Sequence, residues 1–216
     1  MTEFHRYVPD DLAANLRWRV RLRRLAKADR PLQRALMRVC RQDVLFWLKA
    51  FCWLLEPRDR FRDGRLLPKR IPMIPWTHQS PFIVTLRKEL GKRDIGVVKT
   101  RGEGVSWIAC LLGLHDLIFM DDALIGMVSH IEEKSDTPGD PNSLLGKLDW
   151  ELPLLPVWMR GRMGVDLARN KTDHIFTNVL RKSKIKAFSA TKGVGRGERF
   201  GWFFFDEMPE WQYEKA

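Results

Sequence analysis

Two segments about a hundred residues apart carry residue types that suit phosphate chemistry. The first follows the apolar run Ile95–Lys99 and contains Gly102, Gly104 and Ser106. Backbone N–H groups of a glycine-containing turn can surround a phosphate, and the dipole of a following helix adds to the attraction. A hydroxyl at the start of that helix can bind Mg²⁺. We therefore predict a strand over Ile95–Lys99, a phosphate-binding turn, and a helix over Ser106–Leu114.

The second segment is the apolar run Trp202–Phe205, which is followed by Asp206 and Glu207. A carboxylate that ends a buried strand can hold Mg²⁺ through water, beside the hydroxyl of Ser106. The next acid is placed to orient or deprotonate an attacking water. Together the two segments predict a nucleotide-hydrolysing site. For each segment alone, an ordinary turn beside a core strand is the competing interpretation.

The first segment departs from the usual phosphate-loop pattern, GxxxxGKS/T. Val105 stands where that pattern has its lysine, and Lys99 stands where it has its first glycine. A strict motif search would therefore miss this loop. The competing interpretation is a glycine-containing turn between a strand and a helix.

The rest of the second half of the chain alternates between helical and strand patterns. We predict helices over Phe82–Leu90 and Ser143–Leu155, and strands over Leu124–Ile131 and Ile185–Ser189. Alternation of this kind is typical of an α/β fold with a mostly parallel sheet and helices on both faces.

The N-terminal part has a different, helical pattern. We predict one helix over Asp11–Ala28 and a second over Leu32–Leu55, followed by a Pro- and Arg-rich loop over Pro57–Pro75. We predict that this loop contains the boundary between a helical lead-in, residues 1–70, and a catalytic core, residues 71–216. The first helix carries five arginines, which form either a basic arm for phosphates or a partner, or a solvated face: Arg17, Arg19, Arg21, Arg23 and Arg24.

Composition limits the classes of protein and of partner. The 216 residues carry a net charge of +11, which favours nucleic acid or an anionic membrane surface. The three cysteines show no CxxC spacing, so neither a zinc site nor a disulfide framework is indicated. The start has no secretory h-region, and the apolar stretch Val44–Leu55 is too short to span a bilayer. We expect a soluble, cytoplasmic protein.

Taken together, these segments resemble the ATPase part of the large terminase subunit, the motor that packages DNA in tailed bacteriophages. The resemblance covers roughly residues 39–211. One branch of that family has its loop lysine at the beginning of the Walker A loop, as Lys99 stands here. The stretches that carry the resemblance are a helical lead-in, an adenine-recognising segment, the deviant Walker A loop and the Walker B approach: Cys40–Arg58, Pro75–Gln79, Lys99–Trp107 and Gly195–Glu207.

The resemblance implies roles for individual residues. Lys99 would neutralise the β- and γ-phosphates of ATP, and Ser106 with Asp206 would hold Mg²⁺. Glu207 would be the catalytic carboxylate, and Gln79 would hydrogen-bond the adenine edge.

The loop itself would add further contacts. Arg101 would act as an arginine finger in cis on the developing γ-phosphate charge. The remaining nucleotide-binding positions implied by the family are Thr100, Gly102, Gly104 and Val105. Arg196 and Arg199 would contact phosphates of DNA or of a neighbouring subunit's nucleotide, or belong to a flexible basic loop.

At the level of the whole protein, the resemblance implies a P-loop NTPase fold of the ASCE type that uses ATP and Mg²⁺. It implies double-stranded DNA, a portal protein and a small terminase subunit as partners, a homo-oligomeric ring, and the host cytoplasm as location. Large terminases continue beyond Walker B into a coupling motif and a nuclease. The expectation is thus an ATPase segment without the nuclease domain and with an incomplete sheet.

Two other functions remain open on the residues alone. One is a different P-loop ATPase that acts on nucleic acid, such as a helicase relative. The other is a basic DNA-binding or assembly module without ATPase activity. The ATPase interpretation requires that Lys99, Ser106 and Asp206 line one pocket.

Overall fold

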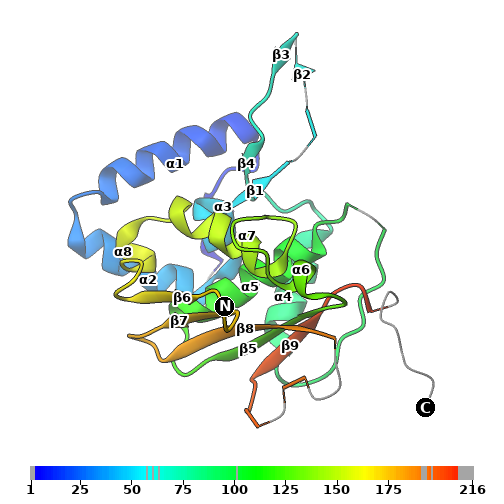
Figure 1. Cartoon of the computed structure of the whole chain (residues 1–216). Coiled ribbons are helices and arrows are strands. Elements are labelled where there is room, and N and C mark those ends of the chain that lie inside the picture. Colours follow the sequence, from blue (N-terminus) through cyan, green and yellow to red (C-terminus); the bar gives the residue numbers. More distant parts are fainter. Residues whose placement is uncertain are drawn as a thin grey trace. The chain divides into compact units, whose positions relative to one another are not determined.

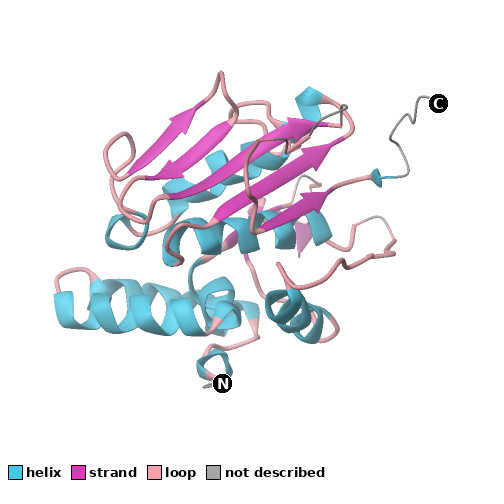
Figure 2. Cartoon of the chain, turned by 90° about the horizontal axis from the view of Figure 1, so that it is seen from below, coloured by secondary structure: helices cyan, strands magenta, loops and turns pink. Residues whose placement is uncertain are grey.

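The computed structural model describes residues 3–56, 58–59, 61–62, 64–100, 102–190, 194–195 and 197–208. The chain divides into two compact units, Met1–Thr85 and Leu86–Ala216. Figures 1 and 2 show the elements, and each unit is described by itself.

The first unit combines helices with two short antiparallel strand pairs. Strand β1 pairs with β4, and β2 pairs with β3. Helix α4 (Gln79–Glu89) leads from this unit into the next. The other elements are η1 (Phe4–Tyr7), α1 (Leu12–Ala26), α2 (Arg30–Gln42), α3 (Val44–Phe51), β1 (Trp53–Leu55), β2 (Phe61–Arg62), β3 (Arg65–Leu66) and β4 (Arg70–Pro72).

The single helix predicted over Leu32–Leu55 is wrong, because the chain breaks at Asp43. The backbone of Asp43 is extended, with φ −127°, and its carboxylate accepts a 3.0 Å hydrogen bond from the N–H of Phe46. Helix α2 ends before Asp43, where the backbone is extended. The Asp43 carboxylate caps α3, because it accepts a hydrogen bond from an N–H group that has no partner within the helix. Every residue of α3 is buried, so this helix is the core of the first unit.

The second unit is an α/β unit whose five-stranded sheet is flanked by helices. The strand order is β6-β7-β8-β5-β9. Its elements are α5 (Val105–Phe119), β5 (Leu124–Ser129), α6 (Glu132–Ser135), α7 (Leu144–Glu151), η2 (Leu152–Leu154), α8 (Val157–Arg160), β6 (Leu167–Asn170), β7 (Ile175–Asn178), β8 (Ser183–Ser189) and β9 (Trp202–Phe205).

The sheet is mixed, which corrects the prediction of a mostly parallel one. Strand β5 is parallel to both β8 and β9, whereas β6, β7 and β8 form an antiparallel meander. Residues 183–189 alternate between buried and more exposed positions, as expected for a strand with one face toward solvent. The predicted strands at β5, β8 and β9 are confirmed, and β6 and β7 were not predicted.

Helix α5 is the core of the second unit. All residues from Ile108 to Phe119 are buried, so this helix is covered on every side. Two side chains of strand β9 contact its neighbours α5 and β5. The indole N–H of Trp202 donates to Asp116 of α5 at 2.9 Å. The ring of Phe203 lies against Gly126 of β5, where a Cβ atom would come within 2.1 Å of the ring.

The strand predicted over Ile95–Lys99 is wrong. In the structure these residues form an exposed segment outside any strand, and Val98 is fully exposed. Strand β9 is the outer strand of the sheet in the described part of the chain. A strand needs a neighbour with which to exchange backbone hydrogen bonds, and these residues pair with none of the described strands.

Candidate functional site

The turn before α5 has the backbone that the sequence predicted. Gly102 has φ 92° and Gly104 has φ 69°, both in the region that glycine adopts without steric cost. Gly104 is the N-cap of α5 and offers no side-chain hydrogen bond to the helix. The first N–H groups of α5 therefore lack a capping side chain, as at the N-termini that bind anions. The helix starts at Val105 and continues to Phe119, beyond the predicted end.

Ser106 and Asp206 meet at the carboxyl end of the parallel strands. The hydroxyl of Ser106 donates to Oδ1 of Asp206 at 2.9 Å, although the two residues are 100 positions apart. Asp206 follows β9 directly, and its N–H donates to the carbonyl of Val128 at 2.9 Å. Packing of α5 against the sheet thus brings the two predicted segments together.

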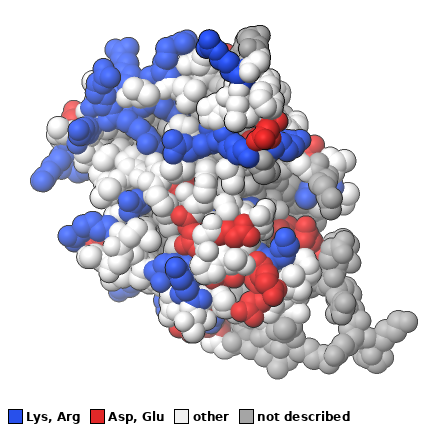
Figure 3. Space-filling view, turned by 45° about the horizontal axis from the view of Figure 1, so that its top comes forward, with Lys and Arg blue, Asp and Glu red and all other residues white. Residues whose placement is uncertain are grey.

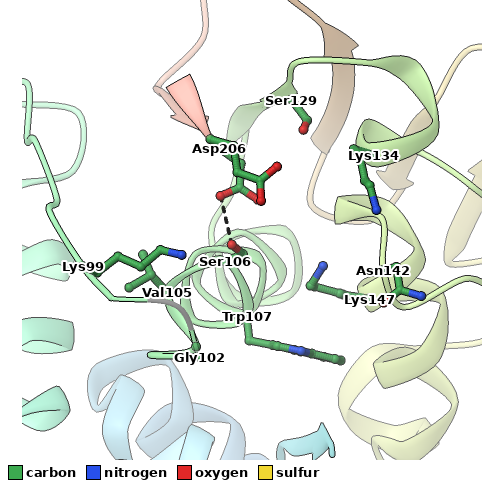
Figure 4. Close-up of a pocket in the computed structure, with 12 residues that line it drawn as sticks. Lys99, Gly102, Val105, Ser106, Trp107, Ser129, Lys134, Asn142, Lys147 and Asp206 are labelled. Carbon is green, nitrogen blue, oxygen red and sulfur yellow. Dashed lines mark hydrogen bonds between the residues drawn. The ribbon is translucent and has the colours of Figure 1, made fainter. Parts of the chain in front are cut away.

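A cavity of about 220 Å³ lies at this point of the second unit. Most of the predicted site residues line it, namely Lys99, Gly102, Gly104, Val105, Ser106, Asp206 and Glu207. In Figure 4 the side chain of Lys99 approaches Ser106 from one side, and the side chains of Lys134 and Lys147 lie on the other. The required grouping of Lys99, Ser106 and Asp206 around one pocket is therefore present.

Glu207 has a strained backbone beside Asp206. Its φ of 52° is in the left-handed region, which costs energy for any residue with a Cβ atom and recurs at functional sites. Its Oε2 lies 3.5 Å from Nδ1 of His130, and the carboxylate is half exposed. This places an accessible carboxylate at the cavity edge, next to the acid that bonds Ser106.

Two other predicted residues, Thr100 and Gln79, do not line this cavity. The hydroxyl of Thr100 donates to Glu103 at 3.2 Å, and Thr100 is exposed. Gln79 belongs to the first unit, where its side-chain oxygen accepts from the N–H of Trp76 at 2.9 Å. Arg101 and Arg196 lie outside the described residues.

Four polar residues of the cavity were missed by sequence reasoning: Ser129, Lys134, Asn142 and Lys147. Ser129 ends β5, and the rule that parallel strands present functional residues at their carboxyl ends could have indicated it. Lys147 lies within the leucine-rich helix α7, where a charge on a buried face is a signal in itself. Lys134 and Asn142 are exposed residues, and the sequence around them carries no such signal.

The cavity is rich in charge. Three lysines and two carboxylates line it. Beneath it lies Cys110, a buried thiol whose pKa is raised to about 12, by burial first and then by the charge of Asp206, against the opposing effect of Lys147. Cys110 is therefore protonated at neutral pH and is a poor nucleophile. The functional groups available at this site are ammonium groups, carboxylates and hydroxyls.

Comparison with known proteins adds no identification. No protein-family model matches the chain, and no curated protein matches its sequence. In the described part of the chain, no helix has the length and apolar character needed to cross a membrane.

Proposed function

We propose that the second unit binds ATP with Mg²⁺ and hydrolyses the terminal phosphate, as a P-loop NTPase does. The observation that carries this proposal is the 2.9 Å approach of Ser106 Oγ to Asp206 Oδ1 in a cavity that Lys99 also lines. The hydroxyl of Ser106 and the carboxylate of Asp206 would hold Mg²⁺ together, the carboxylate through water.

The donor set also fits magnesium chemically. A hydroxyl and a carboxylate are hard oxygen ligands, and Mg²⁺ in such sites takes its other ligands from water and phosphate. Among the described residues, no three His, Cys, Asp or Glu side chains gather in a way that could hold a metal without such help. A bound Mg²⁺ would neutralise charge on the phosphate oxygens.

Residues of the chain itself bind the phosphates and activate a water. The uncapped N–H groups at the start of α5 bind phosphate oxygens, and the positive φ of Gly102 and Gly104 lets the backbone approach them. The ammonium group of Lys99 attracts the β- and γ-phosphates. Glu207 orients a water and accepts its proton, since its carboxylate is accessible at the cavity edge.

We propose further that this ATPase is a segment of a phage terminase large subunit, which drives double-stranded DNA into procapsids. Support comes from the lysine at the start of the loop and from the order of the two Walker segments. On this proposal the chain assembles as a ring with a portal protein and a small terminase subunit, in the host cytoplasm.

The first unit carries a basic surface that would suit a DNA duplex. Figure 3 shows Lys and Arg side chains crowded over the region of α1. Three exposed arginines recur at helical spacing on α1, and three more do so on α2: Arg17, Arg21, Arg24, Arg30, Arg34 and Arg38. Within the described residues, none of these six has an ion-pair partner. Unpaired arginines on one helix face suit the phosphates of a duplex.

Titration of the protein with ATP in the presence of Mg²⁺ tests the nucleotide part, with Lys99→Ala as the comparison. We expect measurable binding by the parent chain and at least about tenfold weaker binding by Lys99→Ala, because one charge-assisted phosphate contact is lost. If the parent chain binds no ATP, the alternative of a basic DNA-binding module without ATPase activity is favoured.

A further inference from the structure

Lys147 is a buried cation that lines the cavity together with Asp206 and Glu207 but forms no ion pair with a described residue. Only 7% of the residue is exposed, and the buried residues of α7 around it are leucines, Gly146 and Glu151. Its ammonium group donates to the carbonyl of Ser143 at 3.2 Å. Within the described part of the chain, no carboxylate lies within ion-pair distance of this group. Removing a charge from water without a partner is unfavourable, so such a group indicates that an anion completes the site.

Ser129 gives a second, independent indication on another element. The residue is 1% exposed, and its Oγ has no hydrogen-bond partner in the described residues. Buried hydroxyl groups are nearly always hydrogen-bonded in folded proteins. Ser129 ends β5 and lines the same cavity as Lys147. Two buried polar groups from separate elements therefore have unused hydrogen-bonding capacity beside one cavity.

Local contacts do not account for Lys147. An ammonium group has three donors, and the Ser143 carbonyl takes one of them. The ring of Trp107 lies 5.8 Å from the ammonium nitrogen, which is at the outer limit of a useful cation–π contact. Neither contact offers an acceptor to the hydroxyl of Ser129. An anion with several oxygens, such as a phosphate, would satisfy both residues.

Lys147 supplies the cavity with a lysine ammonium group, which the loop lacks at Val105. Val105 stands where the usual phosphate loop has a lysine, and Lys99 lies at the other end of the turn. Figure 4 shows the amine of Lys147 directed into the cavity from the side of Ser106 opposite to Lys99. A polyphosphate held at the start of α5 would thus have a lysine on each side.

We propose that Lys147 and Ser129 form a phosphate subsite for the nucleotide polyphosphate, in which Lys147 replaces the lysine absent at Val105. This inference rests on the proposed ATP binding and adds a specific second cation to it. Lys134 and Asn142 line the same cavity but are exposed, so water hydrates their polar groups and no anion is required. Lys184, an exposed lysine of β8 that does not line the cavity, provides a matched control.

Isothermal titration of the full chain with ATP, adenosine and inorganic tripolyphosphate tests the subsite. Lys147→Met keeps the apolar stem and removes the charge. We expect it to weaken ATP and tripolyphosphate binding at least about tenfold and to leave adenosine binding unchanged. Ser129→Ala should weaken binding of the two polyphosphates severalfold, and the control Lys184→Met should change it less than about threefold, because that ammonium group is hydrated and lies outside the cavity lining.

The outcomes separate the two proposals. If the parent chain binds ATP and Lys147→Met binds it equally well, the subsite is refuted while ATP binding stands. If the parent chain binds neither ATP nor tripolyphosphate, the proposed function fails, and the subsite fails with it. Equal losses in Lys147→Met and Lys184→Met would also refute a specific subsite, because general electrostatic attraction would explain them.

A measurement on the unmodified protein covers the case in which Lys147→Met does not fold. Acylation of lysines followed by mass spectrometry reports how accessible each amine is. We expect tripolyphosphate to protect Lys147 strongly and the exposed Lys184 not at all. Unchanged acylation of Lys147 at saturating tripolyphosphate would refute the subsite.

Discussion

Replacing Asp116 by asparagine tests whether its carboxylate holds β9, and the Asp206 that follows β9, against α5. Asp116 is 5% exposed and accepts from two side chains. The guanidinium of Arg87 donates to Oδ1 at 2.5 Å, and the indole of Trp202 donates to Oδ2 at 2.9 Å. One carboxylate therefore joins the end of α4, the last turn of α5 and the start of β9. Asparagine keeps the shape but removes the charge.

The size of the effect follows from the burial of the pair. Removing one partner of a buried ion pair costs about 3–5 kcal/mol, because the other charge stays desolvated. The side chain of Arg87 is 22% exposed, so water can partly replace the carboxylate. We therefore expect the free energy of unfolding to fall by about 2–3 kcal/mol. For a unit of this size, that lowers the Tm by roughly 6–15 °C.

The effect should depend on pH in a defined direction. Burial alone would raise the pKa of Asp116, but the His115 ring, whose Nδ1 lies 3.6 Å from Oδ1, the charge of Arg87 and the Trp202 hydrogen bond outweigh it and hold the pKa below its ordinary value. A carboxyl whose pKa is lower in the folded state stabilises the protein at pH above the unfolded value of about 3.9. That stability is lost as pH falls through the lowered, folded value. The deficit of Asp116→Asn should therefore be constant near neutral pH and shrink below about pH 4.

Thermal unfolding followed by circular dichroism measures the difference, with Asp121→Asn as the matched control. Asp121 bonds Arg181 at 2.7 Å, but its side chain is half exposed, so its loss should have little effect. Because β9 leads directly to Asp206, we also expect Asp116→Asn to weaken MgATP binding without touching the nucleotide. If Asp116→Asn and Asp121→Asn unfold at the same temperature, the anchoring role of Asp116 is wrong.

Two further predictions concern the metal and the DNA. Ser106→Ala should make nucleotide binding nearly independent of Mg²⁺, because a hydroxyl ligand is lost; a parent-like Mg²⁺ dependence in calorimetry would contradict this. Replacing Arg17, Arg21 and Arg24 together by glutamine should reduce the slope of log K against log salt for duplex DNA by about 2.7, since each phosphate contact contributes about 0.9. Lys184→Gln, an exposed charge on β8 in the second unit, should leave the slope unchanged, and an equal reduction would indicate non-specific attraction.

Local sequence rules predicted the elements that are decided by nearby residues. The apolar runs at β5, β8 and β9 are strands, and Gly102 and Gly104 adopt the positive φ that their turn requires. These outcomes follow from side-chain and backbone preferences within a few residues. The same rules failed at Ile95–Lys99, because an apolar run becomes a strand only where another strand accepts its hydrogen bonds.

The sequence by itself determined the two Walker-like segments, since glycines, a serine and paired acids must appear in the chain for such a site to exist. It also determined the strong positive charge. Only the tertiary structure decided that Ser106 and Asp206 lie 2.9 Å apart, because α5 and β9 are packed by contacts far from either residue. The tertiary structure also brought Ser129 and Lys147 to the same cavity. These two groups require hydrogen-bonding partners because folding removes them from water. A local sequence pattern does not show which residues are buried in this way.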